Sequence, residues 1–167
     1  MQLSFDRDVE EFRAEYLKHS FGPSLRQLAD ALGLPLDSVT AAGELATTRG
    51  DIEIAAGTLP AGSVGAQRVT ITGIRNDRPL LRFRANWYCT RDLTEDWTLN
   101  ETGWHISVAG DAPLEVELRM PVPLDRMAEV SPAYTANRAV NSVAAVCAAP
   151  PGIRTTADLP QIVASLG

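Results

Sequence analysis

The amino-acid sequence predicts an α+β fold, in which a mostly antiparallel open sheet of about five or six strands has helices packed on one face. Three observations lead to this class. At both ends of the chain, apolar residues recur at intervals of three and four, which is the spacing of one helix face. In the middle of the chain they alternate with polar residues, as in half-buried strands. Short turn signals separate the alternating stretches, so neighbouring strands are expected to form antiparallel hairpins.

The N-terminal region is predicted to form two short helices that cover the sheet. An amphipathic pattern amid acidic residues predicts the first helix over about residues 6–18. Gly22 and Pro23 are expected to end the connection, because proline is favoured at the first position of a helix. The second helix then ends at Gly33, since glycine readily adopts the left-handed conformation that terminates helices.

The central region is predicted to consist of strands, most of them in two hairpins. The longer predicted strands are residues 40–48, 64–74, 81–88, 104–108 and 114–120. Asn76-Asp77 is expected to reverse the chain in the first hairpin, and Gly110-Asp111 in the second. Shorter strand material is expected at Ile52 and Ile54. Residues 90–102 form a polar connection between the hairpins, which we expect to be a loop that folds down through Trp97.

A longer helix is predicted from Ser131 to the Pro150-Pro151-Gly152 segment, with Ser131 as its N-cap and Pro132 at its first position. Its apolar face is expected to pack on other parts of the protein. That face consists of Ala136, Ala139, Val140, Val143, Ala144 and Cys147. A second stripe at helical spacing brings together a phenol, two amides and a guanidinium, from Tyr134, Asn137, Arg138 and Asn141. This stripe either lines a pocket for a small polar ligand or is simply the solvated side of the helix.

Aromatic and basic side chains on the predicted strands provide further candidates. Trp87, with Tyr88, Trp97 and Trp104, could form the wall of a ligand site, although aromatic residues in strands usually pack in a core. Arg82 and Arg84 alternate with apolar neighbours and are expected to point to water or to a partner subunit; an anion site is the alternative.

Composition limits the possible classes of protein. The 167 residues, 45% of them hydrophobic, predict one domain, residues 1–167, with a core of its own. The net charge of -6 disfavours nucleic acid and anionic membranes as partners. The sequence has neither an apolar stretch of transmembrane length nor a signal-peptide pattern, so a cytoplasmic protein is expected. Cys89 and Cys147 are expected to be small core residues, and the two isolated histidines do not predict a metal site.

Several segments together resemble a known family. They are Ser20-Phe21-Gly22-Pro23, Asp92-Leu93, Asp96-Trp97, Arg138 to Val143, Val146 to Gly152 and Asp158-Leu159-Pro160. The sequence is similar in these segments to dihydrodipicolinate-reductase-like proteins, and within them to the 2,4-diaminopentanoate-dehydrogenase-like group. The resemblance spans nearly the whole chain, and its C-terminal motif is the most specific part.

The resemblance implies that the chain corresponds to the substrate and oligomerisation domain, which in this group follows a nicotinamide-binding Rossmann domain. The sequence has no Gly-x-Gly-x-x-Gly motif after a strand, so no cofactor is expected to bind to these residues. It also lacks the His-His and Lys cluster of true dihydrodipicolinate reductases, and its catalytic residues therefore stay unassigned. A homo-oligomer is expected, formed through the sheet face as in relatives, and a separate Rossmann subunit is a possible partner.

Three functions remain open at this point. The first is a small-molecule-binding and oligomerisation domain that cannot transfer hydride alone, with Tyr134, Asn137, Arg138, Asn141 and Trp87 as its substrate-binding residues. The second is a cofactor-independent enzyme, such as a cyclase, isomerase or hydrolase, that reuses the same pocket. The third is a purely structural domain or a separated subunit of a two-chain reductase.

Overall fold

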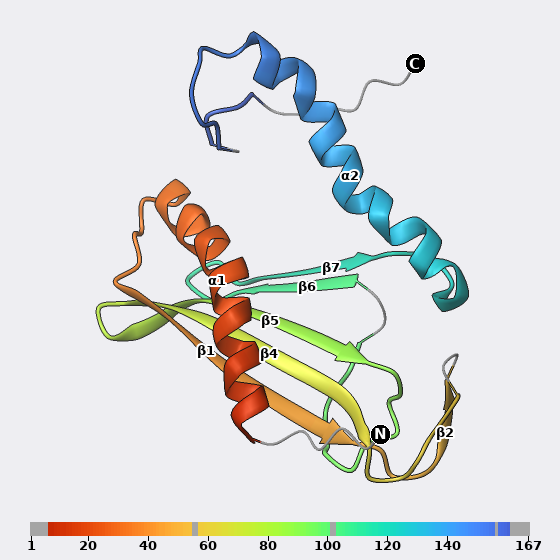
Figure 1. Ribbon diagram of the computed structural model, residues 1–167. Coiled ribbons are helices and arrows are strands. Elements are labelled where there is room, and N and C mark those ends of the chain that lie inside the picture. The colour runs from red at the N-terminus through yellow and green to blue at the C-terminus, as the bar shows by residue number, and fades with distance from the viewer. Residues whose placement is uncertain (1–6, 55–56, 101–102, 156, 161–167) are drawn as a thin grey trace. The chain divides into compact units, whose positions relative to one another are not determined.

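The computed structural model describes residues 7–54, 57–100, 103–155 and 157–160, and the chain divides into two compact units, Met1–Leu99 and Asn100–Gly167 (Figure 1). The first unit contains α1 (Arg7–Ala31), β1 (Ser38–Thr47), β2 (Ile52–Ile54), β3 (Gly57–Leu59), β4 (Val64–Arg75) and β5 (Arg78–Tyr88). The second contains β6 (Gly103–Val108), β7 (Leu114–Arg119) and α2 (Leu124–Ala148). The predicted α+β class is confirmed. The strands form antiparallel sheets of three, two and two strands, where a single sheet of five or six was expected.

The largest sheet has the order β1-β4-β5, with β4 at its centre. The predicted hairpin between β4 and β5 is confirmed, and Arg75 pairs with Arg78 across a two-residue turn. Asn76 and Asp77 have φ angles of 51° and 56° in this turn. Two successive positive φ angles define a type I′ turn, whose twist matches that of the flanking strands. The sequence therefore determines the hairpin register locally.

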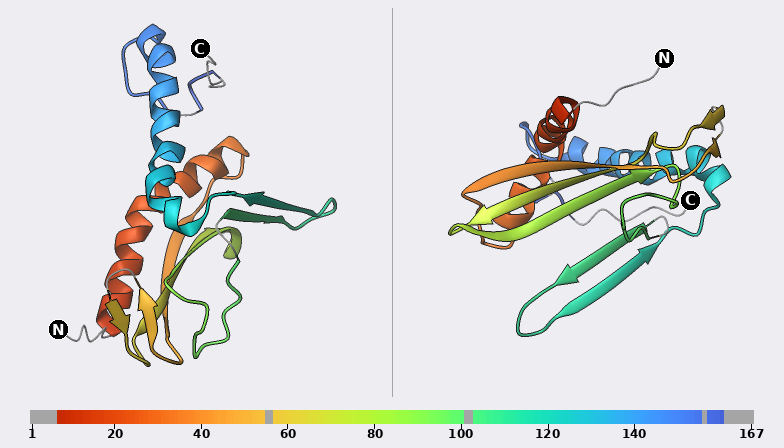
Figure 2. Two further views of the ribbon diagram at one scale, coloured as in Figure 1. Left: turned by 90° about the vertical axis from the view of Figure 1, so that its right-hand side faces the viewer. Right: turned by 90° about the horizontal axis from the view of Figure 1, so that it is seen from below.

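The main core lies between α1 and one face of this sheet. Figure 2 shows the helix and the strands of this unit from two further sides. Its buried members are Leu25, Ala29, Leu36, Val69 and Ile71. Val69 and Ile71 are separated by one residue on β4 and therefore point to the same face. Gly73 continues this row, and a Cβ atom there would lie 2.5 Å from Leu36 Cδ1. A larger residue at position 73 would therefore force the Leu36 side chain to move.

The two helices predicted before residue 33 are a single helix, α1, which includes Pro23. Proline removes one N–H donor from the helix ladder, which is why the sequence predicted a break. Packing outweighs that loss, because Leu17 and Phe21 precede the proline, Leu25 follows it, and all three contact the same core. The predicted end at Gly33 is confirmed. Gly33 has a φ of 71° and donates to Asp30 O, while Leu34 N donates to Ala29 O at 2.9 Å, which is the pattern of a Schellman cap.

The predicted loop after β5 packs against the end of the sheet. Leu93, 2% exposed, forms a second small core with Ala46 and Ala66, and Trp97 packs against this cluster. Gly65 lies beside it, where a Cβ atom would be 2.8 Å from Thr48 Cγ2 and 2.9 Å from Leu93 Cδ2. The loop therefore has a defined position on the sheet.

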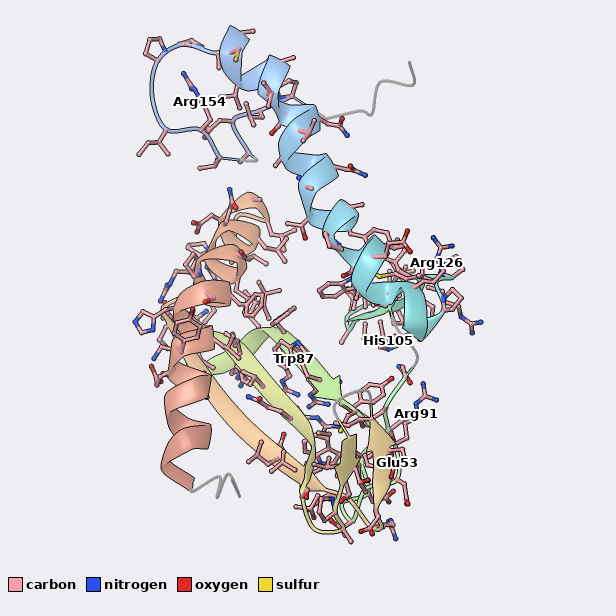
Figure 3. All side chains as sticks on the ribbon, turned by 45° about the vertical axis from the view of Figure 1, so that its right-hand side comes forward. Glu53, Trp87, Arg91, His105, Arg126 and Arg154 are labelled. Carbon is pink, nitrogen blue, oxygen red and sulfur yellow. The ribbon has the colours of Figure 1, made fainter. Side chains whose placement is uncertain are left out.

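In the second unit, β6 and β7 form the predicted second hairpin. One face is apolar and mostly exposed, and consists of Trp104, Ile106, Val108, Leu114, Val116 and Leu118. On the opposite face, His105 contacts Glu115 at 2.9 Å and Glu117 at 2.7 Å. Figure 3 labels His105 on this hairpin. Apolar side chains thus cover one side of the hairpin and charged side chains the other.

The long C-terminal helix begins earlier than predicted, at Leu124, so Ser131 and Pro132 lie inside it. Pro123 precedes the first turn, and Arg126 forms an ion pair with Glu129 at 3.2 Å in the added segment. This i,i+3 pair favours helix in residues that sequence signals alone left outside it. The helix ends at Ala148, just before Pro150, as expected. None of the helices within the described residues is both long enough and apolar enough to span a membrane.

The apolar stripe of α2 is exposed where packing was expected, with Val140 at 67% and Val143 at 57% exposure. Both cysteines are also exposed, so their prediction as core residues is wrong. Cys147 lies on this exposed stripe, and the Cys89 thiol donates to Gly65 O at 3.2 Å. Small apolar residues at helical spacing identify a face but do not show what covers it.

Candidate functional site

A shallow hollow of about 230 Å³ lies between α1 and the sheet, at the end of β5. Tyr16 and Leu17 line it from the helix, and Gln67 and Trp87 line it from the strands. Gln67 and Trp87 are cross-strand neighbours in the β4–β5 register, which places their side chains on the same face. Figure 3 labels Trp87. Trp87 is 46% exposed, so this predicted residue is available to an apolar part of a ligand.

A second hollow, of about 300 Å³, adjoins the first at the open end of the β4–β5 hairpin, away from its turn. Gln67 and Trp87 also line this hollow, with Gly65, Tyr88 and Cys89 among its other residues. Trp87 thus borders two open depressions. Polar groups near it include the Gln67 amide and the Cys89 thiol. The surroundings combine an aromatic surface with a few polar atoms, as small-molecule sites do.

The four predicted helix residues Tyr134, Asn137, Arg138 and Asn141 all lie on α2 and are exposed. Their spacing of three, four and seven residues places them on one side of the helix. The structure therefore brings these four residues together on one helical face, in the second unit. Trp87 lies on β5 and belongs to the first unit.

Arg68 lies on the face of the β1-β4-β5 sheet opposite α1 and has no distinguishing signal in the sequence. Its guanidinium lies 4.1 Å from the centroid of the Trp97 ring, and its Nε donates to Asn86 Oδ1 at 2.9 Å. Partial burial lowers the pKa of Arg68, and the positive charge of Arg84 lowers it further, whereas Glu44 acts in the opposite direction. The cross-strand register predicts that Arg68 lies beside Asn86. Its contact with Trp97 is not predictable from the register, because it depends on the conformation of the loop after β5.

Glu95 holds this loop against the end of β1. Its Oε2 atom accepts hydrogen bonds from Thr47 N at 2.7 Å and from Thr94 Oγ1 at 2.7 Å. Thr94 N also donates to Thr47 O at 2.8 Å. Desolvation acts to raise the pKa of Glu95, but the hydrogen bonds from the two threonines outweigh it, and the pKa lies below its ordinary value. The ionised carboxylate is therefore the form that fits the loop.

Glu95→Gln is expected to weaken the attachment of the loop by about 1 kcal/mol, because the neutral amide is a poorer acceptor. In the wild type, the carboxylate contributes stability above the ordinary pKa of a glutamate, and this contribution is lost as the pH falls through the lowered folded-state pKa. Hydrogen exchange of residues 89–99 from pH 7 to pH 3 should show the loss in the wild type and a smaller pH dependence in the variant. Asp96→Asn is the matched control, and an equal effect of the control would contradict this role of Glu95.

The comparison with known families decides the identity of the domain. The chain matches the family described as the 2,4-diaminopentanoate dehydrogenase C-terminal domain, over residues 9–167. The chain belongs to this family. The match covers both compact units and confirms the resemblance read from the sequence. The search of curated proteins gave no match.

The family assignment places the hollows beside Trp87 and the polar stripe of α2 in a 2,4-diaminopentanoate dehydrogenase C-terminal domain. Across the described residues, no three His, Cys, Asp or Glu side chains lie together in a way that could hold a metal ion. The polar groups beside Trp87 include the Gln67 amide and the Cys89 thiol, and those of the polar stripe of α2 are a phenol, two amides and a guanidinium. These groups can bind and orient a polar ligand through hydrogen bonds.

Proposed function

We propose that the chain is the substrate-binding and oligomerisation domain of an NAD(P)-dependent amine or imine dehydrogenase system. The membership of residues 9–167 in the 2,4-diaminopentanoate dehydrogenase C-terminal family carries this proposal. The same description supports a small diamino acid, with one carboxylate and two amines, as the proposed ligand class. In an NAD(P)-dependent dehydrogenase, the hydride passes to or from a nicotinamide cofactor that is held through its phosphates. We assign that task to a Rossmann module outside these 167 residues, in line with the family's position at the C-terminal end of a dehydrogenase.

The substrate-binding residues in this proposal are Tyr134, Asn137, Arg138, Asn141 and Trp87. Arg138 supplies the charge and the planar donor fork that suit a carboxylate. The Asn137 and Asn141 amides each offer a donor and an acceptor for amine groups, and the Tyr134 hydroxyl adds another. Trp87, which belongs to the first unit, is proposed as an apolar contact for a small ligand in the hollows that it borders. These groups would bind and orient the substrate, and a nicotinamide cofactor held by the Rossmann module would supply the hydride chemistry.

Oligomerisation is the second part of the proposal, and the β6–β7 hairpin supports it. Its apolar face exposes Trp104, Ile106 and Leu118 by 44–50% each. A continuous apolar face of this kind is usually covered in the functional assembly. The contact between copies was expected on an apolar sheet face. The face of the three-stranded sheet opposite α1 instead carries Thr70, Arg84 and other polar residues. We therefore place the contact between copies on the β6–β7 hairpin.

A thermal-shift series tests the binding role. At a ligand concentration about 100-fold above its dissociation constant, 2,4-diaminopentanoate should stabilise the folded chain by about 2.7 kcal/mol. For a protein of this size, the expected rise in Tm is about 5–10 °C. NADPH alone should produce no rise. A rise with NADPH and none with the diamino acid would contradict the proposal, as would a Tm insensitive to both, which is the result for a purely structural domain.

A further inference from the structure

The face of the β1-β4-β5 sheet opposite α1 carries a row of basic side chains. Arg68 on β4 is paired with Asn86 on β5, and Thr70 is paired with Arg84. Residues two apart on a strand point to the same face, so Arg68 and Arg84 are diagonal neighbours there. Arg82 continues the row one step further along β5. Val69 and Ile71 lie at the intervening positions of β4 and are buried under α1.

The loop after β5 fixes the guanidinium of Arg68. The ring of Trp97 lies against it at 4.1 Å, and the Asn86 side chain accepts from its Nε. The Trp97 ring thus contacts the guanidinium carbon, and the Asn86 oxygen contacts its Nε atom. Its two terminal nitrogens have no hydrogen-bond partner within the described part of the chain. A guanidinium held in this way presents its fork to a planar acceptor with little further loss of side-chain entropy.

The positive charge of this row is only partly neutralised. None of the carboxylates that the structure describes lies within ion-pair distance of Arg68, Arg82 or Arg84. The chain as a whole has a net charge of -6, so basic residues gathered without an ion pair are a local departure from its average. The electrostatic repulsion of Arg84 also lowers the pKa of Arg68. An anion between the two guanidinium groups would relieve that repulsion.

We propose that Arg68 and Arg84 form a binding site for a small monocarboxylate on the sheet face opposite α1, beside the ring of Trp97. The carboxylate oxygens accept from the terminal nitrogens of Arg68 and from Arg84. Thr70, directly across from Arg84, contributes a hydroxyl to the floor of the site. Trp97 borders the site and contacts the apolar part of the ligand. The residues of this site belong to the first unit and the helix residues assigned to the diamino acid belong to the second, so the two assignments stand or fall independently.

The charge balance favours a monocarboxylate over a phosphate. Glu44 on β1 is the cross-strand neighbour of Arg68, and its negative charge partly offsets the positive charge of that residue. A dianion would meet repulsion from Glu44 in addition to the attraction of the arginines. A planar carboxylate also matches the geometry of the guanidinium fork.

The test is a titration of the full chain with butanoate, followed by two-dimensional ¹H–¹⁵N NMR of the Trp97 indole and the Arg68 Nε–Hε group. We expect saturable shifts of both signals in the wild type. Arg84→Gln should weaken the fitted affinity at least about tenfold, since one of two charged donors is lost. Arg84 is exposed, so this variant should keep the fold, which a ¹⁵N spectrum without ligand verifies. Arg78→Gln, at the hairpin end of the same strand, is the charge-matched control and should change the affinity by less than twofold.

Three results would overturn the proposal. The first is the absence of saturable shifts at Trp97 and Arg68 with butanoate. The second is an equal loss of affinity in Arg78→Gln and Arg84→Gln, which would indicate a general effect of net charge. The third is equal or tighter binding of butanamide or of inorganic phosphate at the same signals. None of these signals lies on α2, so failure here is distinguishable from failure of the diamino acid to bind.

Discussion

Ile71→Ala is expected to lower the free energy of unfolding of the first unit by about 3 kcal/mol. Ile71 is fully buried, at 0% exposure, on the central strand beneath α1. It belongs to the same cluster as Leu25 and Val69, so its truncation leaves a cavity where helix and sheet meet. Rigid neighbours cannot fill such a cavity completely, and the lost contacts add to the loss of apolar burial. Urea denaturation followed by tryptophan fluorescence would measure the change.

Ile153→Ala is the matched control for this prediction, because it removes the same atoms from a side chain that is 97% exposed. Its effect should be within about 0.5 kcal/mol of zero. Equal destabilisation by the two substitutions would contradict the placement of the core between α1 and β4. A destabilisation by Ile71→Ala alone would support it.

Ile106→Lys is expected to dissociate the proposed oligomer and raise its dissociation constant at least about 100-fold. Ile106 lies in the middle of the apolar face of the β6–β7 hairpin and is 44% exposed in a single chain. An unpaired ammonium group buried between two such faces would cost several kcal/mol, and each 1.4 kcal/mol is a factor of ten. Size-exclusion chromatography with light scattering would report the mass of wild type and variant over a range of concentrations.

The control is Ser107→Lys, which places the same charge on the opposite face of the hairpin. There Ser107 contacts Glu115, so an added lysine meets a carboxylate. The control should keep the mass of the wild type. A wild type that is already monomeric at all concentrations, or an Ile106→Lys variant that retains the wild-type mass, would contradict the hairpin as the contact between copies.

The hairpins and the end of α1 were predictable because their signals are local. Asn76 and Asp77 are among the few residue types that adopt positive φ readily, and both do so here. Gly33 ends α1 for the same kind of reason. The continuous helix through Pro23 was not predictable, because contacts with a sheet much later in the sequence decide it. The early start of α2 was missed because Pro132 resembles a first-turn proline.

The candidate sites also differ in whether local sequence signals or distant contacts define them. The polar stripe of α2, which includes Asn137 and Arg138, follows from helical spacing alone, and the structure places these residues on one helix. Arg68 becomes distinctive only when the loop after β5 returns Trp97 to its guanidinium, across 29 residues of sequence. Such a contact depends on the whole register of the sheet and on the anchoring of the loop by Glu95. Sequence periodicity carries no information about it.

The thermal-shift series with 2,4-diaminopentanoate tests the central claim, that this domain binds the substrate of a dehydrogenase, most directly. We expect a saturable rise in Tm for the wild type and the loss of most of that rise in Arg138→Gln. Arg138 is exposed, so the Tm of this variant without ligand should match that of the wild type. A wild-type Tm that does not respond to the diamino acid would contradict the claim. An undiminished rise in Arg138→Gln would remove α2 from the binding site.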